Sequence, residues 1–412
     1  MSSKQASVFS LGVIVAALGY FVDIYDLLLF GIIRIESLRD LGLTESEIAK
    51  KGLLILNVQM AGLLIGGFLW GVLADKKGRL KVLFASIILY SLGNIANGFV
   101  QTVNQYALIR FITGIGLAGE LGVGITLVVE LLPKEKRGIG AAIVAGFGLT
   151  GAVVAYFIKQ AFDWRICYFI GGGLGFLLLM LRVGVLESAM FKNIEHRNVS
   201  KGNFFMLFNK GRRVRKYIFS ILIGLPTWYV IGILVSFSKE FAEGMGVTGK
   251  IDPGKSIMFA YATIAVGDIA AGLLSQVLRS RKNALYIFYA ITAIGLLWFF
   301  NGTSVASLYG ACALLGFGTG FWSIFVTMAA EQFGTNIRAT VTTTVPNMVR
   351  GALILISLLF TWLQTFNSYV TSGLITGIVA MVIGIASVIL SEETFHKDLN
   401  YVEEEEAAPA LP

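Results

Sequence analysis

Ionisable side chains interrupt several long apolar stretches of this 412-residue sequence. Asp23 and Asp26 lie three residues apart in the first stretch, so a helix presents both carboxylates on one face. A charge inside the hydrocarbon layer is costly, and it usually serves proton transfer or the binding of a charged solute. Other charges of this kind are Arg110, Glu120, Asp268 and Arg350.

The composition places these charges in a bilayer. Hydrophobic residues make up 56% of the chain and charged residues only 14%. Soluble domains contain about 25% charged residues, so this chain is too apolar to be one of them. The two cysteines lack CxxC spacing and the two histidines are isolated, so the sequence predicts no disulfide framework and no metal site.

Twelve apolar stretches are each long enough to cross the roughly 30 Å hydrocarbon layer as a helix. They cover residues 8–33, 51–73, 81–101, 104–131, 138–162, 165–186, 216–242, 254–277, 284–304, 305–331, 338–363 and 368–390.

The basic residues indicate the orientation of these spans. If the N-terminus is cytoplasmic, 21 of the 33 Lys and Arg residues fall in cytoplasmic segments. The positive-inside rule then places both termini in the cytoplasm of a multi-pass cell-membrane protein. The positive net charge reflects topology and does not predict a nucleic-acid partner.

Two sequence features recur 201 residues apart. GVLADKKGRLK begins at Gly71 and GLLSQVLRSRK at Gly272, while the spacing from Glu130 to Arg137 recurs from Glu331 to Arg338. The shared offset predicts two parallel six-helix halves with a midplane site between them. The predicted parts are an N-terminal half (1–186), a cytoplasmic loop (187–215), a C-terminal half (216–391) and an acidic cytoplasmic tail (392–412).

The segment 71–79 resembles the inner-loop motif of the major facilitator superfamily, and the segment 110–120 resembles its fourth-helix motif. The strings at Glu187 and Glu393 are similar to those of the branch with sugar porters, organic-ion carriers and metabolite:proton symporters. This resemblance implies an all-α membrane protein of twelve transmembrane helices. It also implies a transporter that uses a proton gradient and no cofactor, and not an enzyme.

Asp26 and Arg110 are the leading candidates for proton coupling. Asp26 lies about 9 Å outward of the first span's midpoint, and Arg110 has a similar depth in the fourth span, so they can pair. The resemblance implies that Asp26 carries the proton with Arg110 as its counter-charge; a static ion pair is the alternative. Asp23 fits proton transfer or structural hydrogen bonding, and Glu120 fits a proton relay or helix packing.

Arg350 is the leading candidate for binding substrate, with Asn347 one turn earlier in the eleventh span. A guanidinium near the midplane can bind a carboxylate with two hydrogen bonds, and the resemblance to organic-ion carriers favours an anion. An internal bridge from Arg350 to Asp268 or Glu120 is the alternative, and Asp268 is itself a candidate for the site.

The string Pro226-Thr-Trp-Tyr229 lies inside the seventh span. Proline can bend this helix, and Trp228 and Tyr229 offer flat walls with a polar tip for a planar anion. Ordinary helix packing is the alternative.

Charges at the inner ends of the helices predict a cytoplasmic gate, with a simple solvated loop as the alternative. Exposed ion pairs contribute about 0–1 kcal/mol each, which suits a lock that opens in every cycle. The predicted gating residues are Asp75, Arg79, Glu130, Arg137, Glu331, Arg338, Glu187 and Glu393.

These features together predict a monomeric proton symporter that imports a small organic anion by alternating access. A drug:proton antiporter is disfavoured because the glycines at 146–151 lack the following proline of that group. A sugar symporter is disfavoured because the seventh span lacks a Gln-Leu-Ser string. A non-transporting membrane sensor would need neither buried acids nor paired gates.

Overall fold

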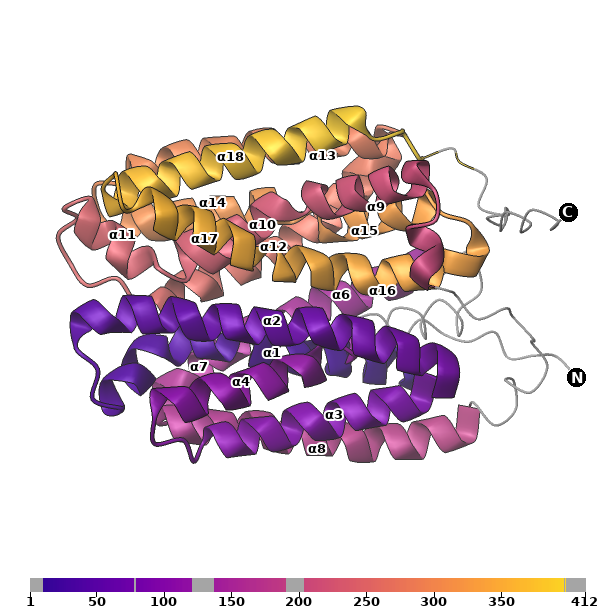
Figure 1. Ribbon diagram of the computed structural model, residues 1–412, viewed down its shortest axis with the longest axis horizontal. Helices are drawn as coiled ribbons and strands as arrows, with labels where there is room; N and C mark the ends of the chain where they lie inside the picture. The colour runs from indigo at the N-terminus through magenta and orange to yellow at the C-terminus, as the bar shows by residue number, and fades with distance from the viewer. Residues whose placement is uncertain (1–9, 78, 121–136, 190–203, 396, 398–412) are drawn as a thin grey trace, which may run out of the picture.

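A computed structural model describes residues 10–77, 79–120, 137–189, 204–395 and 397. Within these residues every regular element is a helix (Figure 1). The N-terminal half contains α1 (Leu11–Asp40), α2 (Glu45–Lys77), α3 (Arg79–Asn97), α4 (Val103–Leu117), α6 (Arg137–Leu149), α7 (Gly151–Ala161) and α8 (Trp164–Ala189).

The C-terminal half forms a second bundle against the first. It begins with the short η2 (Phe204–Leu207) and continues with α9 (Gly211–Ile223), α10 (Leu225–Tyr229), the π-helix η3 (Val230–Val235), α11 (Ser238–Gly244), α12 (Pro253–Val277), α13 (Arg281–Phe300), α14 (Val305–Thr319), α15 (Trp322–Glu331), α16 (Thr335–Gly351), α17 (Leu353–Leu363) and α18 (Tyr369–Leu390).

Ten helical segments of the described chain are long and apolar enough to span a membrane, and Lys81–Asn97 is a shorter apolar helix. Several begin at residues whose side chains accept a hydrogen bond from the first turn. Thr102, Ser280 and Ser368 cap α4, α13 and α18 in this way. Asp252 caps α12, where Pro253 occupies the first turn and, having no backbone N–H, needs no acceptor.

Breaks in the C-terminal half position the central side chains. Near Pro226, where the sequence predicts a bend, α9 ends at Ile223 and α10 starts at Leu225. The predicted tenth span is two helices, α14 and α15, separated at Gly320 and Phe321. A Cβ on Gly320 would lie 2.8 Å from the Cα of Gly267, so α12 crosses this break too closely for a side chain.

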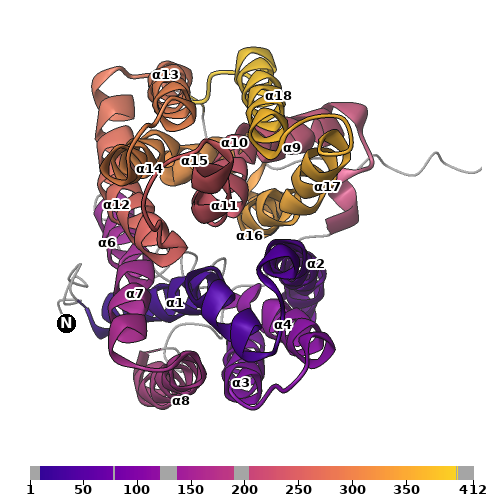
Figure 2. The ribbon, with the colours of Figure 1, turned by 90° about the vertical axis from the view of Figure 1, so that its left-hand side faces the viewer.

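The two halves meet along matched pairs of helices (Figure 2). α2 packs along α16, and α6 and α7 pack along α12. We call the end where α1 begins and α18 ends the proximal end, and the end with α11 and the α1–α2 turn the distal end (Figure 1). The boundary between the halves therefore runs the length of the bundle, with α1 beside it.

Candidate functional site

Asp26 on α1 and Arg110 on α4 form a fully buried ion pair. Arg110 Nη1 lies 2.9 Å from Asp26 Oδ1, and both side chains are 0% exposed. Arg110 Nη2 also donates to the Asp26 carbonyl, and Nε donates to Gln59 Oε1. The predicted contact is therefore present, and it lies wholly within the N-terminal half.

Arg350 on α16 faces Asp23 on α1 across the boundary between the halves. Arg350 Nη2 lies 3.6 Å from Asp23 Oδ2, and both groups are buried. Neither Asp23 oxygen has a hydrogen-bond partner among the described residues, and neither do Arg350 Nε and Nη1. The alternative bridges to Asp268 and Glu120 are wrong, because the acid beside Arg350 is Asp23. Several hydrogen-bonding positions at the centre are thus unsatisfied by the described residues.

Trp322 covers one side of this guanidinium. The Arg350 Cζ atom lies 6.0 Å from the centre of the Trp322 ring, within the range of a cation–π contact. The buried Nε1 of Trp322 has no acceptor within the described chain. Sequence reasoning missed Trp322, although its position directly after the Gly320-Phe321 pair marks the start of a half-helix.

Asn347 connects the two halves beside Arg350. Its Nδ2 donates to the Ala118 carbonyl at 3.1 Å and to the Thr343 carbonyl at 3.2 Å. Its Oδ1 has no partner among the described residues. Asn347 thus has one unsatisfied acceptor, while its amide nitrogen holds α16 against the C-terminal end of α4.

Asp268 is not a free binding group, contrary to the sequence prediction. Its Oδ1 accepts a hydrogen bond from the Ser323 backbone nitrogen at 2.7 Å. Ser323 is the second residue of α15, so Asp268 caps this half-helix from α12. Its carboxylate satisfies a backbone group that the break after α14 leaves open.

Trp228 and Tyr229 have different surroundings. The Trp228 side chain is buried, and its Nε1 has no acceptor in the described part of the chain. The Tyr229 hydroxyl donates to the Gly373 carbonyl of α18 at 2.6 Å. Tyr229 therefore serves helix packing, the alternative left open for it, whereas Trp228 keeps an available donor.

Glu120 forms a buried ion pair with Arg182 of α8. The contact supports the packing alternative for Glu120, since it joins the segment that follows α4 to α8. Gly19 of α1 lies directly against both side chains. Arg182 was not among the candidate residues, so sequence reasoning missed this contact.

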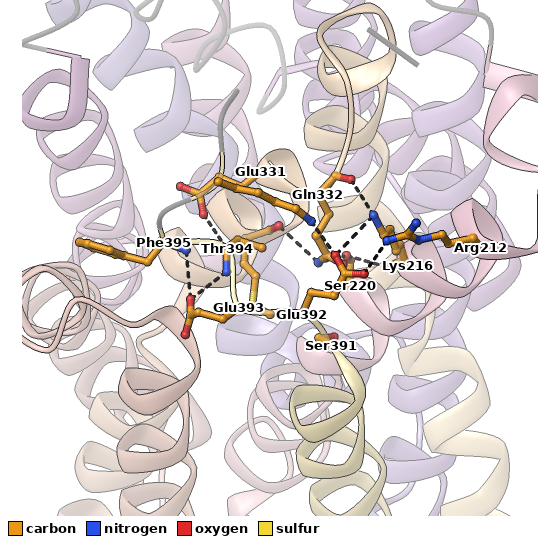
Figure 3. Close-up of polar contacts among 12 residues, drawn as sticks. Arg212, Lys216, Ser220, Glu331, Gln332, Ser391, Glu392, Glu393, Thr394 and Phe395 are labelled. Carbon is orange, nitrogen blue, oxygen red and sulfur yellow. Dashed lines mark hydrogen bonds and ion pairs between the residues drawn. The ribbon is translucent and has the colours of Figure 1, made fainter. Parts of the chain in front are cut away.

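The predicted cytoplasmic gate is described only in part. Glu130 and the side chains of Asp75, Arg79, Arg137, Arg338 and Glu187 lie outside the described residues. Glu331 pairs with Arg281 at 3.0 Å. It also accepts a hydrogen bond from Thr394 Oγ1 at 2.6 Å (Figure 3). The described partners of Glu331 therefore lie on α13 and in the segment after α18, and neither belongs to the N-terminal half.

The segment after α18 binds several helices at the proximal end (Figure 3). Glu393 accepts hydrogen bonds from Ser280 Oγ and from the backbone nitrogens of Arg281 and Lys282. Burial alone would raise the pKa of Glu393, but these bonds outweigh it and the pKa is lowered. Hydrogen bonds from Lys397 and Arg212 lower the pKa of Glu392 to about 2.

A second buried ion pair joins the halves at the distal end. Arg34 of α1 lies 2.7 Å from Glu240 of α11, with exposed fractions of 1% and 14%. Arg34 also donates to the Ser236 carbonyl and lies over the Phe237 ring. Sequence reasoning assigned Arg34 to a loop and missed this contact, because α1 continues to Asp40.

Residues 9–351 match the family profile of the Major Facilitator Superfamily. The chain belongs to this superfamily. It is therefore a multi-pass membrane transporter and not an enzyme, and the prediction of an all-α fold with twelve transmembrane helices is confirmed.

Relatives of this transporter include carriers named for acids. It is 27% identical over 368 residues to the niacin transporter NiaP of Acinetobacter baylyi, covering 79% of this chain and 80% of the relative. It is 31% identical over 233 residues to the sialic acid transporter NanX of Escherichia coli, covering 55% and 56%. It is 22% identical over 424 residues to the benzoate transport protein of Acinetobacter baylyi, covering 92% and 88%.

Proposed function

We propose that this transporter is a monomeric proton symporter that imports a small organic anion across the cell membrane, with both termini cytoplasmic. The main support is the loose contact between Arg350 and Asp23, a buried cation whose remaining donors have no partner in the described chain. Donors left unpaired in a buried site are costly, and a bound carboxylate would satisfy them.

The substrate carboxylate is proposed to replace Asp23 as the partner of Arg350. Arg350 Nε and Nη1 lie on the two sides of Nη2, which faces Asp23, so a carboxylate that replaces Asp23 can bind Nη2 together with either of them. The Trp322 ring offers a flat apolar wall beside the guanidinium. An aromatic or otherwise planar acid suits this combination. The names of the niacin and benzoate relatives support the same chemistry.

Displacement of Asp23 links anion binding to proton uptake. A buried carboxylate that loses its cation is unfavourable as an anion, so Asp23 takes up a proton when the substrate occupies Arg350. Asp26 lies one turn further along α1, where it forms its own buried ion pair with Arg110. Protonation of Asp26 would release Arg110 and loosen α1 from α4.

Alternating access then moves the two halves about this central site. Asp23 and Arg350 belong to opposite halves, so substrate binding changes a contact that joins them. The Arg34–Glu240 pair closes the distal face in the conformation described here. Opening of that face requires this pair to separate.

The test is uptake into proteoliposomes that contain purified transporter and carry an imposed inward proton gradient. Labelled nicotinate, benzoate and sialate are the anion probes, and glucose and a lipophilic cation are the controls. Accumulation of an anion above its equilibrium level, abolished by a protonophore, is the expected result. Accumulation without dependence on the proton gradient would overturn the coupling, and transport of glucose or the cation alone would overturn the anion assignment.

A further inference from the structure

α3 carries a row of polar side chains inside the N-terminal half. Ser86, Tyr90 and Asn94 are spaced four residues apart and so lie on one face of the helix. Ser91 adjoins this face, and all four residues are 0% exposed. Such a row is unusual in a membrane helix, because each buried polar group needs a hydrogen-bond partner.

These groups have no such partners in the described part of the chain. The unpaired atoms are the hydroxyl oxygens of Ser86, Tyr90 and Ser91 and both amide atoms of Asn94. A serine hydroxyl can turn back to its own helix, but the longer side chains of Tyr90 and Asn94 cannot do this as readily. Buried polar groups in this condition are normally satisfied by internal water.

The row extends between two buried acids. At its distal part, the Asn94 amide lies close enough to the Asp26 carboxylate to interact with it, although Asp26 Oδ2 makes no well-formed hydrogen bond among the described residues. At the proximal part of the row, Gly119 packs against Ser86, because a Cβ on Gly119 would lie 2.8 Å from Ser86 Oγ. Glu120 is the next residue, so it lies near the Ser86 end of the row. Tyr90 lies between them, near enough to both acids to interact with their charges.

We propose that a file of buried water along this face of α3 carries protons between Asp26 and Glu120, a role that rests on the proton-coupled transport proposed above. Each water and the Tyr90 hydroxyl can accept one proton and donate another, so a proton enters at one end and leaves at the other. No other reactant is consumed. The eight residues from Asn94 to Ser86 cover about 12 Å toward the proximal face.

The position of Glu120 fits the exit of such a path. Its partner Arg182 is buried with it, and Gly19 leaves room for both groups one turn before Asp23. A proton leaving Asp26 would therefore reach a second acid that lies closer to the proximal end. The Glu120–Arg182 pair gains a role in proton release in addition to helix packing.

The test compares net uptake driven by a proton gradient with counterflow exchange, which moves substrate without net proton transfer. Tyr90→Phe and Asn94→Leu should lower net uptake at least about tenfold, which corresponds to a barrier about 1.4 kcal/mol higher, while exchange stays within about twofold. Asn94→Ser keeps a polar group and space for water, so it should recover most of the net uptake. Tyr289→Phe is the control, since the Tyr289 hydroxyl already donates to the Ile223 carbonyl.

X-ray hydroxyl-radical footprinting provides a readout of the water itself. Tyr90 should be oxidised although its side chain is 0% exposed, because radicals form in water beside it, and Tyr289 should stay unlabelled. Equal loss of exchange and net uptake in Tyr90→Phe and Asn94→Leu would overturn the proposal, as would unlabelled Tyr90. A wild-type protein that ignores the proton gradient would instead refute the coupling proposed for the whole transporter.

Discussion

Asp23 and Arg350 face each other across the two halves at 3.6 Å, close enough to attract but without a hydrogen bond. In contrast, Arg110 holds Asp26 at 2.9 Å within a single half. The two carboxylates lie three residues apart on α1, yet one pair is tight and the other is loose. The proposed substrate site uses the loose pair, because an incoming anion would there replace a weak partner.

Arg350→Gln should weaken anion binding by about 30-fold or more, since losing one partner of a buried charge pair costs about 2–5 kcal/mol. Arg350→Lys keeps the charge but loses the planar donors, so its affinity should lie between those of the glutamine variant and the wild type. Calorimetry with the best anion from the uptake test measures both values. Unchanged affinity in Arg350→Gln would place the carboxylate elsewhere.

Asp26→Asn should leave substrate exchange measurable and abolish accumulation against a gradient, because asparagine cannot take up the coupling proton. The change leaves Arg110 buried without its carboxylate partner, which is destabilising by about 3–5 kcal/mol. The double variant Asp26→Asn/Arg110→Gln removes that charge and controls for folding. Uphill accumulation by the single variant in proteoliposomes would show that the proton is carried elsewhere.

The sequence could predict how deep in the membrane each candidate side chain lies along its helix. Asp26 and Arg110 have similar depths in spans one and four, and the structure confirms their contact. Depth does not give the direction in which a side chain points around its helix. The sequence therefore could not distinguish Asp23 from Asp268 or Glu120 as the neighbour of Arg350.

Breaks in the helices limited the remaining predictions. A mean hydropathy pattern treats residues 305–331 as one span, whereas Gly320 divides it into α14 and α15. The break creates a backbone nitrogen that Asp268 caps, and it places Trp322 over Arg350. Apolar patterning alone contains no signal for either contact, because both depend on how α12, α15 and α16 pack.

Asp268→Asn should transport nearly as well as the wild type, because asparagine keeps the oxygen that accepts from Ser323. Asp268→Ala removes the cap, which costs about 1 kcal/mol, and frees the start of α15. The apparent affinity of Asp268→Ala for substrate should fall about fivefold. The pH profile of uptake by Asp268→Asn should match that of the wild type. Equal loss of transport in both variants would mean that the charge of Asp268 is required.

Glu392→Gln should lower the melting temperature slightly at pH 7, by about 1–3 °C, because exposed ion pairs contribute little. Hydrogen bonds from Lys397 and Arg212 lower the Glu392 pKa to about 2 in the folded protein, below an ordinary value of about 4.3. The stabilisation is therefore present above about pH 5 and is lost progressively toward pH 2. Melting curves recorded between pH 4 and pH 8 measure the difference in melting temperature between Glu392→Gln and the wild type. This difference should become smaller only at the acidic end of the range. A difference that grows on acidification would contradict this linkage.

Glu240→Gln should shift the transporter toward a conformation that is open at the distal face. Arg34 is almost fully buried, so the loss of its carboxylate partner removes a desolvated contact between the halves. A change of about 2 kcal/mol would alter the ratio of closed to open forms about 30-fold. Spin labels at Asp40→Cys and Glu243→Cys, in a background without Cys167 and Cys312, report this ratio as a distance distribution.

Glu45→Gln is the matched control at the same face. Glu45 pairs with Lys239 at 2.8 Å across the same boundary, but its side chain is 58% exposed. Because an exposed pair contributes about 0–1 kcal/mol, this variant should leave the distances almost unchanged. The exchanged pair Arg34→Glu/Glu240→Arg should restore part of the closed population. Equal shifts in Glu45→Gln and Glu240→Gln would mean that burial of the Arg34 pair does not hold the distal face closed.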